Sequence, residues 1–145
     1  MKITSPAFGH NQTIPAKYTC DGENINPPLQ FSDVPARAQS LVLIMDDPDA
    51  PMGMWVHWTL WNIDPKISNF PENSVPEGAV QGATNRENRY GGPCPPDREH
   101  RYFFKLYALD AKLDLGADAK KDELESAMNG HVLDQAELVG LYNRR

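Results

Sequence analysis

In two segments of the chain, successive side chains would point to opposite faces of a strand, and both faces carry large side chains. In residues 56–63, one face carries Val56, Trp58 and Leu60, and the other carries His57, Thr59, Trp61 and Ile63. In residues 102–109, one face carries Tyr102, Phe104, Leu106 and Ala108, and the other carries Phe103, Lys105, Tyr107 and Leu109. Because both faces of each strand need cover, the pattern predicts two packed sheets rather than one sheet with a wet face.

The remaining pattern agrees with a β protein whose helices come late. Residues 40–45 form an apolar run that predicts a strand buried on both faces. Residues 117–128 are rich in helix formers, and Asn129 and Gly130 supply a stop. Asp134 can cap a final helical turn or two over residues 136–142. We therefore expect a mostly antiparallel β-sandwich with one or two C-terminal α-helices.

Length and charge narrow the function classes. Residues 1–145 contain no repeat or linker, so we expect a single domain. The net charge of −6 argues against binding to nucleic acid or to an anionic membrane surface. No apolar run is long enough for a signal peptide or a membrane span, which predicts a cytoplasmic protein without membrane insertion. In that compartment Cys20 and Cys94 are expected to be reduced thiols, and a disulfide between them is the less favoured alternative.

A stiff loop precedes the second alternating strand. Pro93, Pro95 and Pro96 fix φ and remove backbone donors, while Gly91 and Gly92 allow turns that other residues avoid. The loop carries little apolar surface of its own, and it delivers His100 to the start of the aromatic strand. We interpret it as the wall of a binding site, in which an X–Pro bond could be cis.

A second segment, residues 46–62, pairs an acidic, proline-bounded turn with a strand that carries His57. Together the motifs Asp47-Pro48-Asp49-Ala50-Pro51, Trp55-Val56-His57 and Gly91 through Tyr102 resemble the phosphatidylethanolamine-binding protein family, the Raf kinase inhibitor-like proteins, and most closely its bacterial branch. The resemblance covers nearly the whole chain and implies the same β-sandwich fold. It also implies one small anion-binding pocket formed by Asp47, His57, Gly92, Pro93, His100 and Tyr102, supported by Asp49, Pro51 and Trp55, with no cofactor and no metal.

The pocket chemistry has alternatives at each residue. A carboxylate on the turn near His57 would orient its ring and raise its pKa, whereas a lone buried histidine would be neutral and bonded to a backbone carbonyl. Asp46, Asp47 and Asp49 could equally be turn residues whose side chains bond local backbone N–H groups. By the family motif Asp47 faces the pocket, and we expect Asp46 to face solvent and Asp49 to hold the turn. His100 is expected at the rim, and the alternative is a solvated loop histidine.

Two further groups complete the expected anion site. The Tyr102 hydroxyl can donate to a phosphate oxygen, although the residue could equally be a core or rim aromatic. Backbone N–H groups near Gly92 and after Pro96 could form an anion-binding concavity.

Two departures from the family pattern concern the rim of this pocket. The connection of Met52, Gly53 and Met54 is shorter than in eukaryotic members, which predicts a more open pocket. Residues 97–99, Asp-Arg-Glu, stand where bacterial relatives often have glycine and add charge at the rim.

The leading functional hypothesis is a non-enzymatic protein that binds a phosphate or phospholipid head group and regulates a signalling partner such as a kinase. One alternative is a kinase or protease inhibitor that acts through its surface. The other is an enzyme in which Asp47, His57 and His100 hold a catalytic zinc. A homodimer is compatible with the bacterial branch, but no sequence feature requires it.

Overall fold

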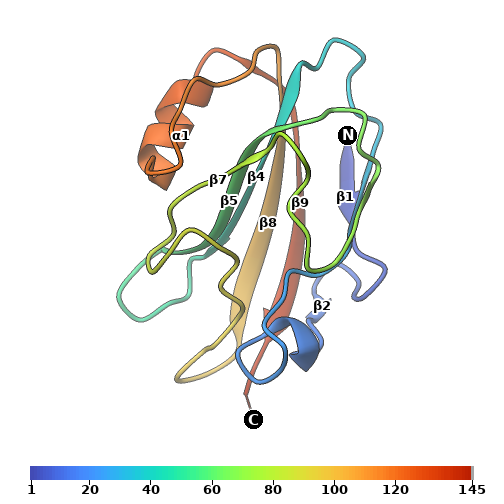
Figure 1. The fold of residues 1–145 in the computed structure, drawn as a ribbon. Helices are drawn as coiled ribbons and strands as arrows, with labels where there is room; N and C mark the ends of the chain where they lie inside the picture. The colour runs from blue at the N-terminus through green and yellow to red at the C-terminus, as the bar shows by residue number, and fades with distance from the viewer. Residues whose placement is uncertain (145) are drawn as a thin grey trace.

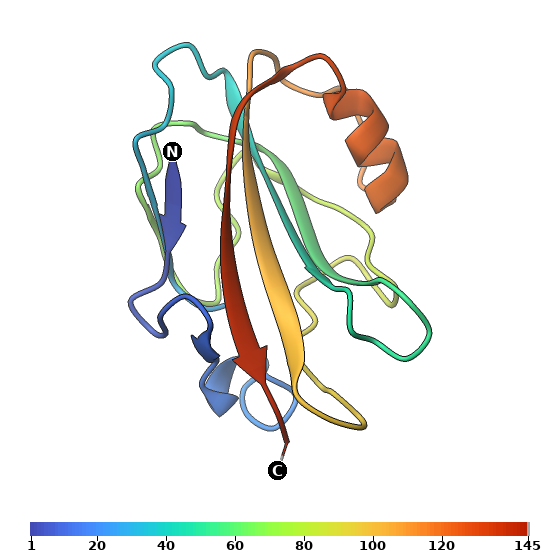
Figure 2. The same cartoon turned by 180° about the vertical axis from the view of Figure 1, so that it is seen from behind.

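The computed structural model describes residues 1–144 and contains two sheets, as the alternating segments predict (Figures 1 and 2). The larger sheet has the order β2 (Gln12–Thr13), β9 (Val132–Tyr142), β8 (His100–Leu109), β4 (Ser40–Asp47), β5 (Trp55–Ile63) and β7 (Val80–Gln81). The smaller sheet has the order β1 (Lys2–Thr4), β3 (Leu29–Ser32) and β6 (Asn69–Phe70). The strand pairs are antiparallel, except that β2 runs parallel to β9. The predicted fold class is confirmed.

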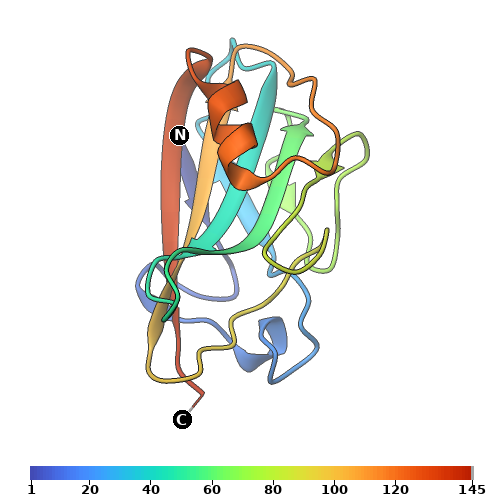
Figure 3. The same ribbon diagram turned by 90° about the vertical axis from the view of Figure 1, so that its left-hand side faces the viewer.

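Apolar side chains cover both faces of the central strands. The inner cluster, on the face of the large sheet toward the small sheet, includes Leu43, Trp58, Leu60, Phe104 and Leu106. On the opposite face, Val42, Ile44 and Trp61 pack with Leu124 and Met128 of the helix α1 (Lys121–Met128), which lies across this face in Figure 3. Strand β4 is therefore buried along its whole length, as predicted from its apolar run.

Two irregularities in the pairing of β4 with β5 break the strict alternation. The register shifts between Leu41 and Leu43 and again between Met45 and Asp46. At the first shift Asn62 adopts a positive φ of 55°, and Ile63 packs in the inner cluster rather than on the face of Trp61, where alternation placed it. At the second shift Met45 pairs with Trp58 and Asp46 with Val56, which leaves His57 as the extra residue. An extra residue of this kind redirects a side chain.

The C-terminal prediction is only half right. Helix α1 begins at Lys121, later than expected, where the Lys120 backbone N–H donates to the Glu123 carboxylate at 3.2 Å. The prediction of a final helical turn over residues 136–142 is wrong, because this segment belongs to β9 and pairs with β8 along its length. Hydrogen bonding to a long neighbouring strand outweighs the local preference. Helix α1 has eight residues, and no helix within residues 1–144 is long and apolar enough to cross a membrane.

The two cysteines are joined, which overturns the prediction of reduced thiols. Cys20 and Cys94 form a disulfide that links the loop after the 3₁₀ helix η1 (Ala16–Tyr18) to the proline-rich loop. The Cys20 backbone N–H also donates to the Pro93 carbonyl at 3.1 Å, so a hydrogen bond joins the two loops beside the disulfide. The earlier expectation came from an inferred compartment, which carries no information on whether two loops meet. No peptide bond within the described residues is cis, so the proline-rich loop is all trans.

Candidate functional site

A cavity of about 450 Å³ opens at the end of the large sheet where β4 ends and β8 begins. The connection between β4 and β5 and the loops around residues 20–24 and 84–96 complete its walls. Its lining includes Asp47, Pro51, Trp55, His57, Gly92, His100 and Tyr102, whereas Asp49 and Pro93 are not part of the lining. Alternation explains the position of two of these residues. Asp47 lies two residues after Met45 on β4, and Tyr102 lies two residues before Phe104 on β8, so both are on the inner face of the large sheet.

His100 is held between two carboxylates. Its Nδ1 lies 2.7 Å from Oδ2 of Asp47, and its Nε2 lies 2.6 Å from Oδ1 of Asp97. Carboxylates only accept, so both ring nitrogens must carry a proton to make both bonds, and His100 is then an imidazolium. Burial alone lowers the pKa of His100, but the bonds and charges of Asp47 and Asp97 outweigh it and raise the pKa. The residue is 1% exposed, so it is not the rim residue that the sequence suggested.

His57 has the opposite character. Its Nδ1 lies 2.6 Å from the carbonyl oxygen of Gly91, which fixes the proton on Nδ1 and leaves Nε2 as an acceptor in the neutral ring. Burial lowers the pKa of His57, and the attraction of Asp47 does not compensate. The prediction that a turn carboxylate orients His57 and raises its pKa is therefore wrong. Asp47 orients His100 instead, and His57 has the carbonyl partner that we considered as the alternative.

Tyr102 lies between the two imidazoles. Its ring meets His57 edge-on with 5.2 Å between centroids, and it stacks on His100 with 6.3 Å between centroids. The residue is 1% exposed, and burial raises the pKa of its hydroxyl, which therefore stays protonated at neutral pH. The three rings form one continuous aromatic wall.

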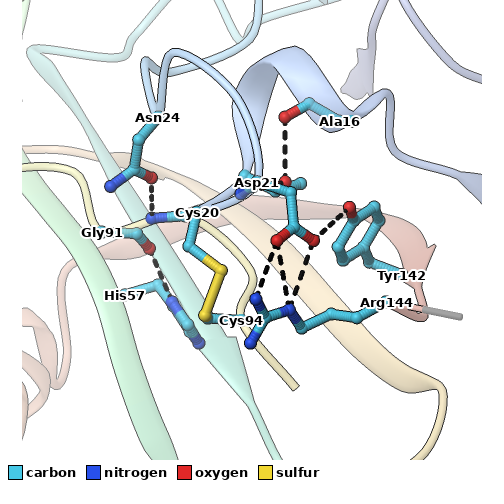
Figure 4. Close-up of a disulfide and its surroundings, with 11 residues drawn as sticks. Ala16, Cys20, Asp21, Asn24, His57, Gly91, Cys94, Tyr142 and Arg144 are labelled. Carbon is cyan, nitrogen blue, oxygen red and sulfur yellow. Dashed lines mark hydrogen bonds and ion pairs between the residues drawn. A yellow bond between two sulfur atoms is a disulfide. The ribbon is translucent and has the colours of Figure 1, made fainter. Parts of the chain in front are cut away.

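The segment of Gly91 and Gly92, which forms one wall of the cavity, is bonded to the Asn24 side chain of the N-terminal loop. The Gly92 backbone N–H donates to Oδ1 of Asn24 at 2.8 Å, so this donor is not free for the anion that we predicted there. Figure 4 shows this bond, the His57–Gly91 bond and the disulfide side by side. On the other side of the disulfide, Asp21 accepts from Tyr142 and Arg144.

The other two aspartates of the turn have separate structural partners. Asp46 is fully buried on the α1 face, where it pairs with Lys105 at 3.0 Å and Lys121 at 3.5 Å, so the prediction that it faces solvent is wrong. Asp49 accepts from Nε and Nη2 of Arg101, both at 2.9 Å, and also from the Arg101 backbone N–H. The hydrogen bonds to Arg101 lower the pKa of Asp49 to about 2. Asp49 therefore fixes the turn, and its backbone N–H in turn donates to Asp47.

Sequence reasoning missed several residues of the cavity. Arg86 lies at its mouth with its guanidinium 5.8 Å from the Trp55 ring centroid, and Tyr90 closes the wall by donating to the Tyr18 carbonyl. An isolated arginine in a loop gives no motif. Asp97, which the sequence marked as added charge near His100, bonds to His100 but is not part of the lining. Residues 1–144 contain no group of three or more His, Cys, Asp or Glu side chains arranged to hold a metal ion.

Comparisons with known proteins agree along the whole chain. The family model of phosphatidylethanolamine-binding protein matches residues 4–143. A UPF0098 protein of Methanothermobacter thermautotrophicus is 50% identical, with 99% of each chain covered, and one of Chlamydia pneumoniae is 47% identical with the same coverage. A crystal structure of a phosphatidylethanolamine-binding protein homolog from Chlamydia trachomatis has a TM-score of 0.96 at 46% identity, covering 99% of this chain and 97% of that one. Escherichia coli YbcL has a TM-score of 0.92 at 28% identity, covering 99% and 98%.

Proposed function

The chain belongs to the phosphatidylethanolamine-binding protein family, and from this premise we propose that it is a non-enzymatic protein whose cavity binds a small anion. Inorganic phosphate and the phosphate of a phospholipid head group share the chemistry that the cavity would recognise. A protein partner such as a kinase, a homodimer and a cytoplasmic location remain predictions from the family resemblance.

The observation that carries the proposal is a pair of histidines in one cavity with different partners, two carboxylates for His100 and a backbone carbonyl for His57. His100 supplies a buried positive charge, and the ring of His57, whose Nε2 is free of the Gly91 bond, packs against Tyr102 in the same cavity. Arg86 adds a guanidinium at the mouth. An anion in the cavity would be close to charged or chargeable donors, and hydrogen bonds that involve a charged partner are about twice as strong as neutral ones.

Proton uptake should accompany binding. His57 can donate from Nε2 only when its ring gains a second proton, because Nδ1 already donates to the Gly91 carbonyl. Burial lowers the pKa of His57, so the ring is neutral without a ligand at neutral pH. A nearby anion favours the charged ring and raises this pKa. Acidification should therefore strengthen binding.

Titration calorimetry with sulfate and with inorganic phosphate tests this proposal. Sulfate does not change its own charge between about pH 6 and about pH 8, so a change in its affinity reports on the protein. We expect tighter binding at the lower pH, with proton uptake measured from buffers of different ionisation enthalpy. His57→Ala should weaken binding about tenfold, the order expected for one charge-assisted hydrogen bond, and should flatten the pH dependence.

His131→Ala is the matched control, because His131 is exposed and lies beyond the opposite end of β8. This variant should bind as the wild type does. Equal affinity at both pH values, unchanged by His57→Ala, would contradict the proposal. That result would favour the alternative of an inhibitor that acts through its surface.

A further inference from the structure

His100 lines the cavity, but its Nε2 is occupied by Asp97, an exposed residue that is not part of the lining. The Asp97 carboxylate accepts from Nε2 of His100 at 2.6 Å, although the Asp97 side chain is 45% exposed and the His100 side chain 1% exposed. Its other hydrogen bond comes from the adjacent Arg98 backbone N–H at 3.0 Å. Asp97 can therefore leave His100 by moving into solvent, without disturbing the core.

His100 itself cannot turn to offer another donor. Its Nδ1 is fixed by Asp47, and the Asp47 carboxylate is fixed in turn by the Asp49 backbone N–H at 2.7 Å. The ring also stacks on Tyr102. Consequently Nε2 points to one position, and a single acceptor can occupy it at a time.

We propose that Asp97 is an internal competing ligand: its carboxylate fills the anion position on His100 and must be displaced when an external anion binds there. This inference rests on the proposed function and adds the control of affinity to it. Asp97 lowers the affinity of the cavity in two ways, because it uses the donor of His100 and because its charge repels a second anion. It also selects among ligands, since only an anion that bonds more strongly than a tethered carboxylate displaces it.

The energetics allow such an exchange. Solvent screens an ion pair that has an exposed partner, and the Asp97 side chain is exposed, so its bond to His100 is weaker than a fully protected one. The hydrogen bond with His100 lowers the pKa of Asp97, so Asp97 remains charged at neutral pH and competes as an anion. A phosphate brings several oxygens into a cavity that both histidines line, whereas Asp97 bonds to His100 and not to His57.

Asp97→Asn tests the competition, because the amide keeps the size of the side chain and removes its charge. We expect inorganic phosphate to bind this variant about tenfold more tightly than the wild type, the effect of releasing one charged hydrogen bond. The nitrogen NMR signal of His100 Nε2 should shift on adding phosphate, and in the variant it should saturate at lower phosphate concentration. Glu99→Gln is the control, because it changes the charge equally on an exposed residue next to His100.

The outcomes separate the two proposals. Phosphate binding that is tighter in Asp97→Asn but not in Glu99→Gln supports the competition. Wild-type binding that requires His57 but is unchanged in Asp97→Asn overturns the competition and leaves the proposed function standing. Absence of phosphate binding in the wild type and in Asp97→Asn overturns both.

Discussion

At the residue scale, the two site histidines show how far partners can be inferred from sequence. The motifs identified His57, His100 and Asp47 as neighbours of one cavity, and all three line it. They did not show which ring meets which acceptor, because an extra residue in the pairing of β4 with β5 redirects His57 toward Gly91. Asp97 was expected to add charge at the rim, but its bond to His100 could not be predicted, since that contact depends on the path of one short loop.

Asp49→Asn should lower stability at neutral pH and have little effect in strong acid. The folded pKa of Asp49 is about 2, below its ordinary value of 3.8, so its contribution is present above about pH 4 and is lost as the pH falls through 2. Because the Arg101 side chain is 54% exposed, we expect only about 1 kcal/mol. Urea unfolding at several pH values measures it.

Asp114→Asn, at an exposed aspartate outside the cavity, is the control for that series. The wild type and Asp114→Asn should have similar stability at each pH. A constant difference between the wild type and Asp49→Asn down to about pH 2 would show that Arg101 does not hold the carboxylate in its charged form.

At the scale of elements, strands were predictable and their irregularities were not. The segments 40–45, 56–63 and 102–109 all lie in strands, because alternation reports a local geometry. Residues 136–142 were assigned to a helix because local sequence preference carries no information about pairing with the distant strand β8. The same limit applies to the proline-rich loop: its stiffness could be predicted, but its contacts with Asn24 and Cys20 join segments far apart in sequence.

Gly92→Ala should destabilise the protein by about 1–3 kcal/mol through overpacking. A Cβ at residue 92 would lie 2.9 Å from the Thr19 Cα, and closer still to the Asn24 side chain and the Tyr18 carbonyl. Gly91→Ala is the neighbouring control, because its Cβ would lie 3.8 Å from the nearest atom, the His57 carbonyl oxygen. Urea unfolding of both variants should separate them, and equal stability would mean that the N-terminal loop yields easily.

At the scale of the whole molecule, the disulfide between Cys20 and Cys94 joins two loops at the cavity that no strand pairing connects. The disulfide spans 74 residues, and both cysteines contribute to the cavity lining. The apolar clusters on the two faces of the large sheet are formed mainly by side chains of the strands and of α1. The disulfide should therefore matter more to the loops around the cavity than to the sheets.

Removing the disulfide should lower the free energy of unfolding by roughly 2–4 kcal/mol, because the cross-link restricts a long loop of the unfolded chain. The double variant Cys20→Ser, Cys94→Ser and the reduced wild type should unfold at the same lower urea concentration. The native amide NMR spectrum should change near residues 20–24 and 91–96 but little in α1. Identical stability with and without reductant, with the cysteines shown to be paired, would contradict this account.

The position of β9 in the large sheet has a consequence for how a cell makes this protein. Among the strands of residues 1–144, β9 is the last to be synthesised, yet it lies between β8 and β2, and β2 pairs with no other strand of this sheet (Figure 2). While the ribosome still holds residues 132–142, one long edge of β8 has no partner. The sheet can therefore be completed only after residues 132–142 have left the ribosome, and until then the nascent protein presents an open strand edge along β8.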